Sequence, residues 1–266
     1  MNNKIGVGVV TYKRPKFFKK CIDSIPNVDT IAVVNDGYTY DLSLYPSDIK
    51  ELIHHTKNKG VGISKNELLR YLIQDGCQHI FLVEDDMLIT NPKVFEEYIK
   101  LAAATGIWHL NFGYHGPANK KPDGTKNPRL IVEYKNSVKL ALNPNCVGSF
   151  SYYHRGVIKN VGYIDEKFVN CWDHVEHTNR IIQAGLHPPF WWFADLANSD
   201  EYISEQASSE VSTTITRTPE WIKNFHEGAA WYAHKHGHIP TKTPDTSPER
   251  VINILKNLHT NYAKPT

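Results

Sequence analysis

Three consecutive carboxylates, Glu84, Asp85 and Asp86, directly follow the apolar run HIFLV at residues 79–83. Adjacent carboxylates repel one another, and an unpaired charge is costly in a low-dielectric core. A divalent cation would relieve this repulsion, because Mg²⁺ or Mn²⁺ prefers carboxylate oxygens together with substrate phosphates. The stretch therefore indicates either a strand that ends in solvent or a site where a cation meets a phosphate-bearing substrate.

The elements that must position these carboxylates alternate between apolar strands and amphipathic helices. The expected strands are 5–12, 30–36, 51–55 and 79–86, and the expected helices are 17–25, 63–76 and 91–106. Nearly continuous apolar strands separated by helices predict a mainly parallel sheet flanked by helices on both faces, in the α/β class.

Several polar residues follow these strands at their carboxyl ends. Thr11 and Tyr12 come after IGVGVV, and Asp36 comes after TIAVVN. Ligands of open parallel sheets bind outside the carboxyl ends of the strands. We therefore expect these residues and the acidic triplet to share one edge of the sheet.

The second part of the chain does not continue the alternation of apolar strands and amphipathic helices. Residues 114–129 form a basic loop, the segments 129–134 and 137–142 form a hairpin, and 205–218 is a Ser/Thr-rich loop with mobile character. Two amphipathic helices follow, at 219–237 and 248–264. We predict one catalytic domain over 1–240, with a nucleotide-sugar-binding half at 1–106 and an acceptor-side half at 107–240, and a C-terminal helical extension at 241–266.

The composition is that of an ordinary globular protein. The chain has 266 residues, 41% of them hydrophobic and 22% charged, and a formal net charge of +2. This charge is too small to indicate nucleic-acid or membrane binding by itself. The four cysteines are widely spaced, and no apolar run approaches the roughly 20 residues of a membrane span. We expect a cytoplasmic protein with free thiols and no integral membrane contact.

Six motifs in order carry a resemblance to a known family. They are VGVVTYKRP, VVNDG, NKGVGISKN, FLVEDDM, GSFSYYHRGVIKNVGYIDEKF and CWDHVEHTNRIIQAG. This set resembles the nucleotide-sugar glycosyltransferases of the GT-A fold, especially family 2, and the resemblance covers about residues 4–187. The acidic triplet is similar to the EDD form of the DxD motif of that fold.

The resemblance implies roles for the residues at the strand ends. Asp86 would bind Mn²⁺ or Mg²⁺, and Asp85 and Glu84 would hold the ribose hydroxyls or metal-bound water. Asp36 would accept a hydrogen bond from the nucleobase imide, or form a turn before Gly37.

Further donor contacts are expected beside these. Thr11 and Tyr12 would pack against the base, again as the resemblance implies. Arg14 would reach the diphosphate, or belong to a solvated turn. In NKGVGISKN, Gly60 permits a close backbone approach.

Lys65 and Asn66 lie in the first turn of the helix that follows Gly60, where they would face the nucleotide. The alternative for Asn66 is a plain helix N-terminus.

Transfer of a sugar requires a group that takes the proton of the acceptor hydroxyl. The resemblance points to an acidic residue after Trp172, which is Asp173 here. A histidine stands where the family commonly has a second acid, so His174 and Glu176 remain alternatives. Asp173 could instead cap the following helix.

Two other features were candidates for the site. A late histidine often completes the metal site in this family, and His226 is preferred here over His187, His234, His236 and His238. The aromatic block at 188–193 is either a platform for the acceptor sugar or part of the core.

The sequence thus predicts a metal-dependent, inverting glycosyltransferase that moves a sugar from a nucleotide diphosphate donor, with a UDP-sugar favoured, to a hydroxyl of a saccharide acceptor. A hydroxylated base of viral DNA or a protein side chain remains an alternative acceptor. A nucleotidyltransferase is disfavoured, because those enzymes usually have a glycine-rich loop after the first strand and TYKRPKFF contains no glycine. A non-catalytic sugar-binding domain of the same fold is the remaining alternative.

Overall fold

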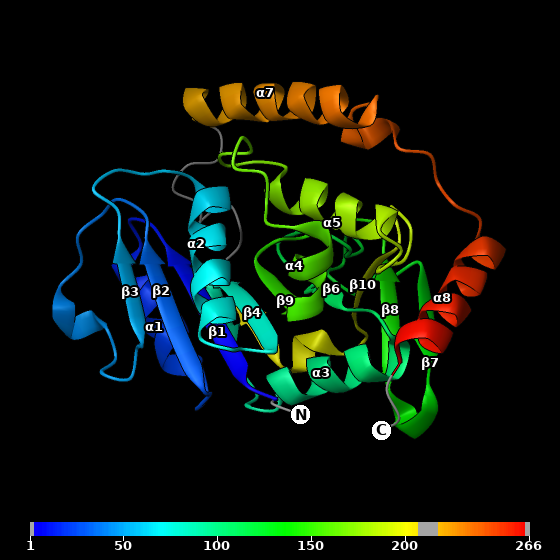
Figure 1. Ribbon diagram of the computed structural model, residues 1–266, viewed down its shortest axis with the longest axis horizontal. Helices are drawn as coiled ribbons and strands as arrows, with labels where there is room; N and C mark the ends of the chain where they lie inside the picture. The colour runs from blue at the N-terminus through cyan, green and yellow to red at the C-terminus, as the bar shows by residue number, and fades with distance from the viewer. Residues whose placement is uncertain (1–2, 207–217, 264–266) are drawn as a thin grey trace.

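A six-stranded mixed sheet forms the centre of the structure, a computed structural model that describes residues 3–206 and 218–263 (Figure 1). Its strand order is β3-β2-β1-β4-β9-β6. The four parallel strands are β1 (Ile5–Thr11), β2 (Thr30–Asn35), β3 (Glu51–His54) and β4 (His79–Glu84). The other two are β9 (Phe150–His154), which is antiparallel to β4, and β6 (His109–Asn111), which is antiparallel to β9. The predicted α/β class with a mainly parallel sheet is confirmed.

Helices cover both faces of this sheet because the strands are apolar on both sides. On one face, α2 (Val61–Gln74) buries Leu68, Leu69 and Leu72 against β1, β2 and β4. On the other face lie α1 (Pro15–Ser24) and α3 (Val94–Thr105). In Figure 1, α2 crosses in front of the parallel strands and α1 lies behind them. The helices hold the sheet while leaving the carboxyl ends of its strands uncovered.

A second sheet and several short elements complete the fold. The second sheet, in the order β10-β8-β7, is antiparallel and consists of β7 (Leu130–Glu133), β8 (Lys139–Asn143) and β10 (Phe193–Leu196). Its β7-β8 pair matches the hairpin predicted from the sequence. A small pair is formed by β5 (Met87–Ile89) and β11 (Ile203–Glu205). Within the described residues, the remaining helices are α4 (Arg155–Val161), α5 (Asp173–Gln183), α7 (Pro219–His236) and α8 (Pro248–Tyr262), with 3-10 turns at Leu42–Leu44, Lys135–Ser137, Ser199–Glu201 and Pro240–Lys242.

The parts predicted as separate halves share one sheet and one core. The strands β6 and β9 come from the acceptor-side half but lie in the same sheet as β1 to β4. The predicted C-terminal extension contributes Val251, Leu255 and Leu258 of α8 to the core beside α3.

The aromatic block at 188–193 belongs to the core. Phe190, Trp192 and Phe193 are buried, and the Trp192 indole donates a hydrogen bond to Asp245 Oδ1 at 3.0 Å. The rings therefore fill space between the second sheet and the chain before α8, which resolves the open alternative against an acceptor platform.

Within the described residues, the structure contains no helix that is both long and apolar enough to cross a membrane. The loop expected at 205–218 lies mostly outside the described residues, which omit 207–217.

Two buried histidines make the stability of the fold sensitive to acid. Burial lowers the pKa of both His177 and His187 from the ordinary 6.5 to about 4. Because the folded-state pKa lies below the unfolded-state value, their contribution is intact above about pH 6.5 and is lost as the pH falls toward 4. We expect the free energy of unfolding to fall by about 2 to 3 kcal/mol for each histidine between about pH 7 and 4.5. Denaturant titrations at both pH values measure this loss.

A His177→Gln variant should lose its own share of this acid sensitivity. A matched control is His234→Gln, because His234 is exposed on α7. An acid-induced loss of stability in His177→Gln equal to that of the wild type would contradict the assignment.

Candidate functional site

A cavity of about 410 Å³ opens beside the carboxyl ends of β1, β2 and β4. Of the predicted site residues, those that line it are Thr11, Tyr12, Arg14, Asp36, Glu84, Asp86, Asp173 and His174. The strands point toward α7, which crosses the top of the view in Figure 1. The expectation that the polar strand ends share one edge of the sheet is thus met by the geometry.

Asp85 lies beneath this cavity and is fully buried. Its Oδ2 accepts a hydrogen bond from the Thr11 hydroxyl at 2.6 Å, and its Oδ1 is paired with the Arg14 guanidinium. Burial raises the pKa of Asp85 to about 7, although the Arg14 charge and the Thr11 hydroxyl favour the ionised form. Asp85 therefore anchors the residues around the cavity and does not itself line it.

Arg14 joins the two aspartates of the triplet. Besides its contact with Asp85, its Nη1 donates to Asp86 Oδ2 at 3.1 Å. The guanidinium is mostly buried, with the side chain 16% exposed. Arg14 thus belongs to the site and not to a solvated turn.

Asp86 presents a carboxylate oxygen that suits a cation. Its Oδ1 is buried at the cavity and has no hydrogen-bond partner among the described residues. A buried anionic oxygen without a donor is costly, and a hard divalent cation would satisfy it. Asp86 therefore fits Mn²⁺ or Mg²⁺.

The cation would need further ligands from beyond the described side chains. In residues 3–206 and 218–263, no group of three or more His, Cys, Asp or Glu side chains is arranged to hold a metal ion. Mg²⁺ commonly binds through one or two carboxylates together with substrate phosphates and water. The site suits a cation that arrives with a diphosphate.

The structure does not bring His226 to Asp86. His226 is exposed on α7 and does not line the cavity. The reason is helical geometry: Gly228 and Tyr232, four residues apart, form the buried side of α7, and His226 lies off that side. The selection of His226 as a metal ligand is therefore not supported.

Asp36 is held by the loop that follows β3. Its Oδ1 accepts from the Lys59 amide at 2.7 Å, and its Oδ2 accepts from the Gly60 amide at 3.0 Å. Gly60 has φ +97°, and a Cβ there would lie 2.4 Å from the Val169 carbonyl oxygen. Only glycine fits this close approach, so Gly60 acts by orienting Asp36 and does not line the cavity.

Lys65 connects the acidic triplet to the predicted base. Its ammonium donates to Glu84 Oε1 at 2.9 Å and to Asp173 Oδ2 at 3.4 Å. Burial alone would lower the pKa of Lys65, but the Asp173 and Glu84 carboxylates raise it well above its usual value. Lys65 is therefore a buried cation that faces two carboxylates, where the sequence analysis expected it to face the nucleotide.

Asn66 is turned away from the cavity. Its amide donates to the Ile164 carbonyl at 2.8 Å, and its Oδ1 accepts from the Ile164 amide at 2.9 Å. These two bonds fasten α2 to the segment before α5. The structure thus gives Asn66 a role in holding the fold, and the expected contact with the nucleotide is not supported.

Asp173 is the acid of the α5 start that reaches the cavity. It is the first residue of α5, and the N-cap is Trp172, with φ 68° and no side-chain cap bond. Burial alone would raise the pKa of Asp173, but Lys65 and His174 hold it well below its usual range. The Asp173 side chain contacts Lys65 and His174, so the alternative role as a helix cap is not what the structure shows.

Glu176 is excluded as the base by its position. It is fully buried and pairs with Arg180 at 3.0 Å, Lys235 at 2.6 Å and His236 at 3.3 Å. Lys235 and His236 connect α5 to α7, and neither these residues nor Glu176 lines the cavity. His174 does line the cavity and bonds to Asp173 Oδ1 at 3.2 Å.

Sequence reasoning missed several residues of the cavity wall, among which are Asn58, His115, Cys146, Asn170 and Trp221. Asn58 begins the motif NKGVGISKN, and the neighbouring glycines could have marked it. His115 and Trp221 come from a loop and from the first turn of a helix, where no periodic pattern singles out one side chain.

The family model described as "Glycosyl transferase family 2" matches residues 7–162 of this sequence. The chain belongs to glycosyl transferase family 2. The matched segment of this family 2 protein contains the three strand ends, Arg14, Lys65 and the acidic triplet. The resemblance found in the sequence is confirmed.

Known proteins similar to this family 2 chain are distant in sequence. An uncharacterized glycosyltransferase of Acanthamoeba polyphaga mimivirus is 24% identical over 229 residues, which are 80% of this chain and 85% of that protein. TarS 1-349 of S. aureus, in complex with UDP-GlcNAc, has a TM-score of 0.57 and 17% identity over 98% of this chain and 73% of its own. The mannosyltransferase PcManGT of Pyrobaculum calidifontis, in complex with GDP-Man and Mn²⁺, has a TM-score of 0.57 and 13% identity over 98% and 71%. These likenesses show a shared GT-A fold.

Proposed function

We propose that this family 2 glycosyltransferase is metal-dependent and inverting, and that it moves a sugar from a UDP-sugar to a hydroxyl of a saccharide acceptor. The observation that carries the proposal is the cavity that contains both the partnerless oxygen of Asp86 and the carboxylate of Asp173. One group suits the phosphate end of a donor and the other suits an acceptor hydroxyl. The complexes of TarS with UDP-GlcNAc and of PcManGT with GDP-Man and Mn²⁺ agree with a nucleotide-sugar donor, and the first of them with a UDP-sugar.

The protein's own residues divide the reaction between the two ends of the cavity. Asp173 takes the proton of the acceptor hydroxyl while that oxygen bonds to the anomeric carbon from the face opposite the diphosphate. The bond from the anomeric carbon to the phosphate oxygen breaks, and its electron pair leaves with the diphosphate. Arg14 lies beside Asp86, where its positive charge would stabilise the negative charge of the departing diphosphate. A divalent cation bound at Asp86 would neutralise further negative charge on the diphosphate.

Inversion at the anomeric carbon requires one general base and no covalent intermediate. Asp173 can supply that base, so we propose an inverting reaction. The low pKa of Asp173 keeps its carboxylate ionised at neutral pH. The same stabilisation by Lys65 and His174 makes it a weaker base, so full basicity requires that these contacts loosen when the acceptor binds. Trp221, His115 and Asn170 add an aromatic face and polar side chains to the cavity wall, which suits a saccharide acceptor.

The four cysteines are free thiols, in agreement with the cytoplasmic location that we propose.

Nucleotide binding with and without metal tests the proposal. We expect UDP to raise the thermal midpoint of unfolding when Mn²⁺ is present and to raise it much less when Mn²⁺ is absent. A ligand at about 100 times its dissociation constant stabilises the folded state by about 2.7 kcal/mol, which is readily measured. GDP and CDP serve as controls for the base. A protein whose midpoint responds to none of these nucleotides, with or without Mn²⁺, contradicts the proposed function.

A further inference from the structure

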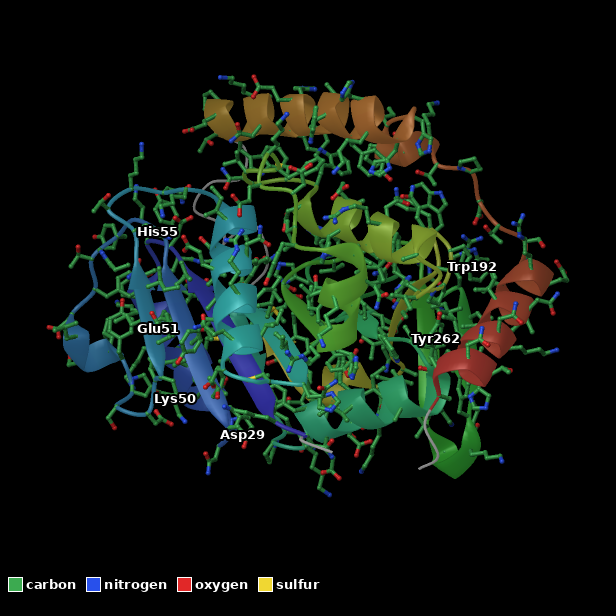
Figure 2. The ribbon with its side chains drawn as sticks, in the orientation of Figure 1. Asp29, Lys50, Glu51, His55, Trp192 and Tyr262 are labelled. Atoms are coloured by element: carbon green, nitrogen blue, oxygen red, sulfur yellow. The ribbon has the colours of Figure 1, made fainter. Side chains whose placement is uncertain are left out.

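His55 lies buried between two carboxylates at the edge of the site. It directly follows β3, and Figure 2 shows it at the end of that strand toward which the chain runs from Glu51. Its Nδ1 is 2.7 Å from Asp36 Oδ1, and its Nε2 is 2.5 Å from Glu67 Oε2. The His55 side chain is 2% exposed, so water does not compete for these contacts. Both ring nitrogens are thus committed to acids.

This geometry determines which form of the ring fits. A neutral imidazole has one donor nitrogen and one acceptor nitrogen, and only the protonated ring donates at both. An acceptor nitrogen facing a carboxylate oxygen at these distances would place two lone pairs against each other. The other charged group at this cluster is the Lys59 ammonium, which lies 3.4 Å from Glu67 Oε1 and is partly exposed.

The consequence falls on Asp36, which lines the cavity. Its Oδ1 accepts from both His55 and the Lys59 amide, so the two lone pairs of this oxygen are occupied. Among the described residues, its Oδ2 accepts only from the Gly60 amide, which leaves one lone pair of this oxygen without a donor in that part of the chain. An ionised carboxylate can only accept hydrogen bonds. Asp36 therefore offers a fixed acceptor to whatever occupies the cavity.

We propose that His55 is a positioning residue that holds Asp36 as a fixed hydrogen-bond acceptor, and that it thereby selects donors whose base carries a ring N–H. Uracil has such a group at N3 and guanine at N1. Cytosine and adenine instead present a ring nitrogen with a lone pair at the corresponding position, which an ionised carboxylate repels. Glu67, on α2, fixes the orientation of the ring through its contact with His55 Nε2. This inference rests on the proposed function, because it concerns the base of the nucleotide donor.

The test compares nucleotide affinity in three variants by calorimetry with UDP and CDP in the presence of Mn²⁺. In His55→Gln we expect the dissociation constant of UDP to rise by about tenfold, because a hydrogen bond to a charged group is lost. The preference for UDP over CDP should shrink, and kcat at saturating donor should change by less than about twofold. Glu67→Gln keeps the His55 contact with Asp36 and should give a smaller change of the same sign. His54→Gln is the matched control, because His54 is the neighbouring histidine and is exposed.

A second readout does not depend on nucleotide binding. Long-range ¹H–¹⁵N spectra of the wild type, with the His55 signals assigned from their absence in His55→Gln, should show both ring nitrogens protonated at about pH 7. A neutral tautomer overturns the inference, as does wild-type affinity and base preference in a folded His55→Gln variant. A wild-type protein that binds neither UDP nor GDP contradicts the proposed function, and the base-selecting role falls with it. Wild-type binding that is unchanged in His55→Gln contradicts the role of His55 alone.

Discussion

Replacing Asp173 with asparagine is expected to lower kcat by about 10²–10⁴-fold, the usual contribution of a general base. Asparagine keeps the shape of the side chain but cannot take the proton of the acceptor hydroxyl. Because the proposed role of Asp173 is toward the acceptor and not toward the nucleotide, the dissociation constant of UDP should change little. Steady-state transfer assays and calorimetry with UDP measure the two quantities separately.

The matched control for this experiment is His174→Gln, because His174 lines the same cavity and touches Asp173. We expect a decrease in kcat of less than about tenfold, since His174 then acts only through its hydrogen bond to Asp173. The reverse order, with His174→Gln the more damaging change, would identify His174 as the base. Both variants should be checked for folding, because Asp173 also offsets the buried charge of Lys65.

Replacing Asp86 with asparagine is expected to lower kcat/KM by about 10³-fold, which corresponds to about 4 kcal/mol of transition-state stabilisation. The substitution removes the carboxylate charge beside the diphosphate while preserving the volume of the side chain. The same variant should lose the Mn²⁺-dependent increase in thermal midpoint with UDP. Transfer assays over a range of Mn²⁺ concentrations, together with thermal unfolding, measure both effects.

Glu84→Gln is the control for Asp86, because Glu84 belongs to the same triplet but contacts Lys65. The Glu84 side chain is 30% exposed, and the oxygen of a glutamine at this position can still accept a hydrogen bond from Lys65. We expect the Mn²⁺ dependence to persist in Glu84→Gln. Persistence of that dependence in Asp86→Asn would instead show that the cation binds elsewhere.

The sheet and its ligand-binding edge could be predicted because their signals are local and periodic. Each parallel strand is a short apolar run followed by a polar residue, as in Thr11, Asp36 and the triplet that starts at Glu84. Since parallel strands end at the same edge, identifying the strands also located their terminal residues. The hairpin of β7 and β8 was predictable for the same reason, because its two apolar segments are separated by a short turn.

The partners of the buried charges could not be predicted, because they depend on tertiary packing. Lys65 and Asp173 are 108 positions apart in the chain, and Asp36 and His55 are 19 apart. The pattern around Lys65 marks a helix start but does not show that a second helix places a carboxylate against it. His226 illustrates the same difficulty, since several late histidines look alike until the direction of each on its helix is known.

The place of β9 in the central sheet affects how the chain can fold during synthesis. In the folded protein β4 lies between β1 and β9 in the sheet. Until residues 150–154 have left the ribosome, the edge of β4 that pairs with β9 has no hydrogen-bonded partner strand. An exposed apolar strand edge pairs readily with other chains. A fragment that stops at residue 106 would keep this edge open permanently, so it should aggregate and not behave as an independent nucleotide-binding unit. Rapid delivery of β9, or shielding of β4 by a chaperone, would protect the nascent chain during this interval.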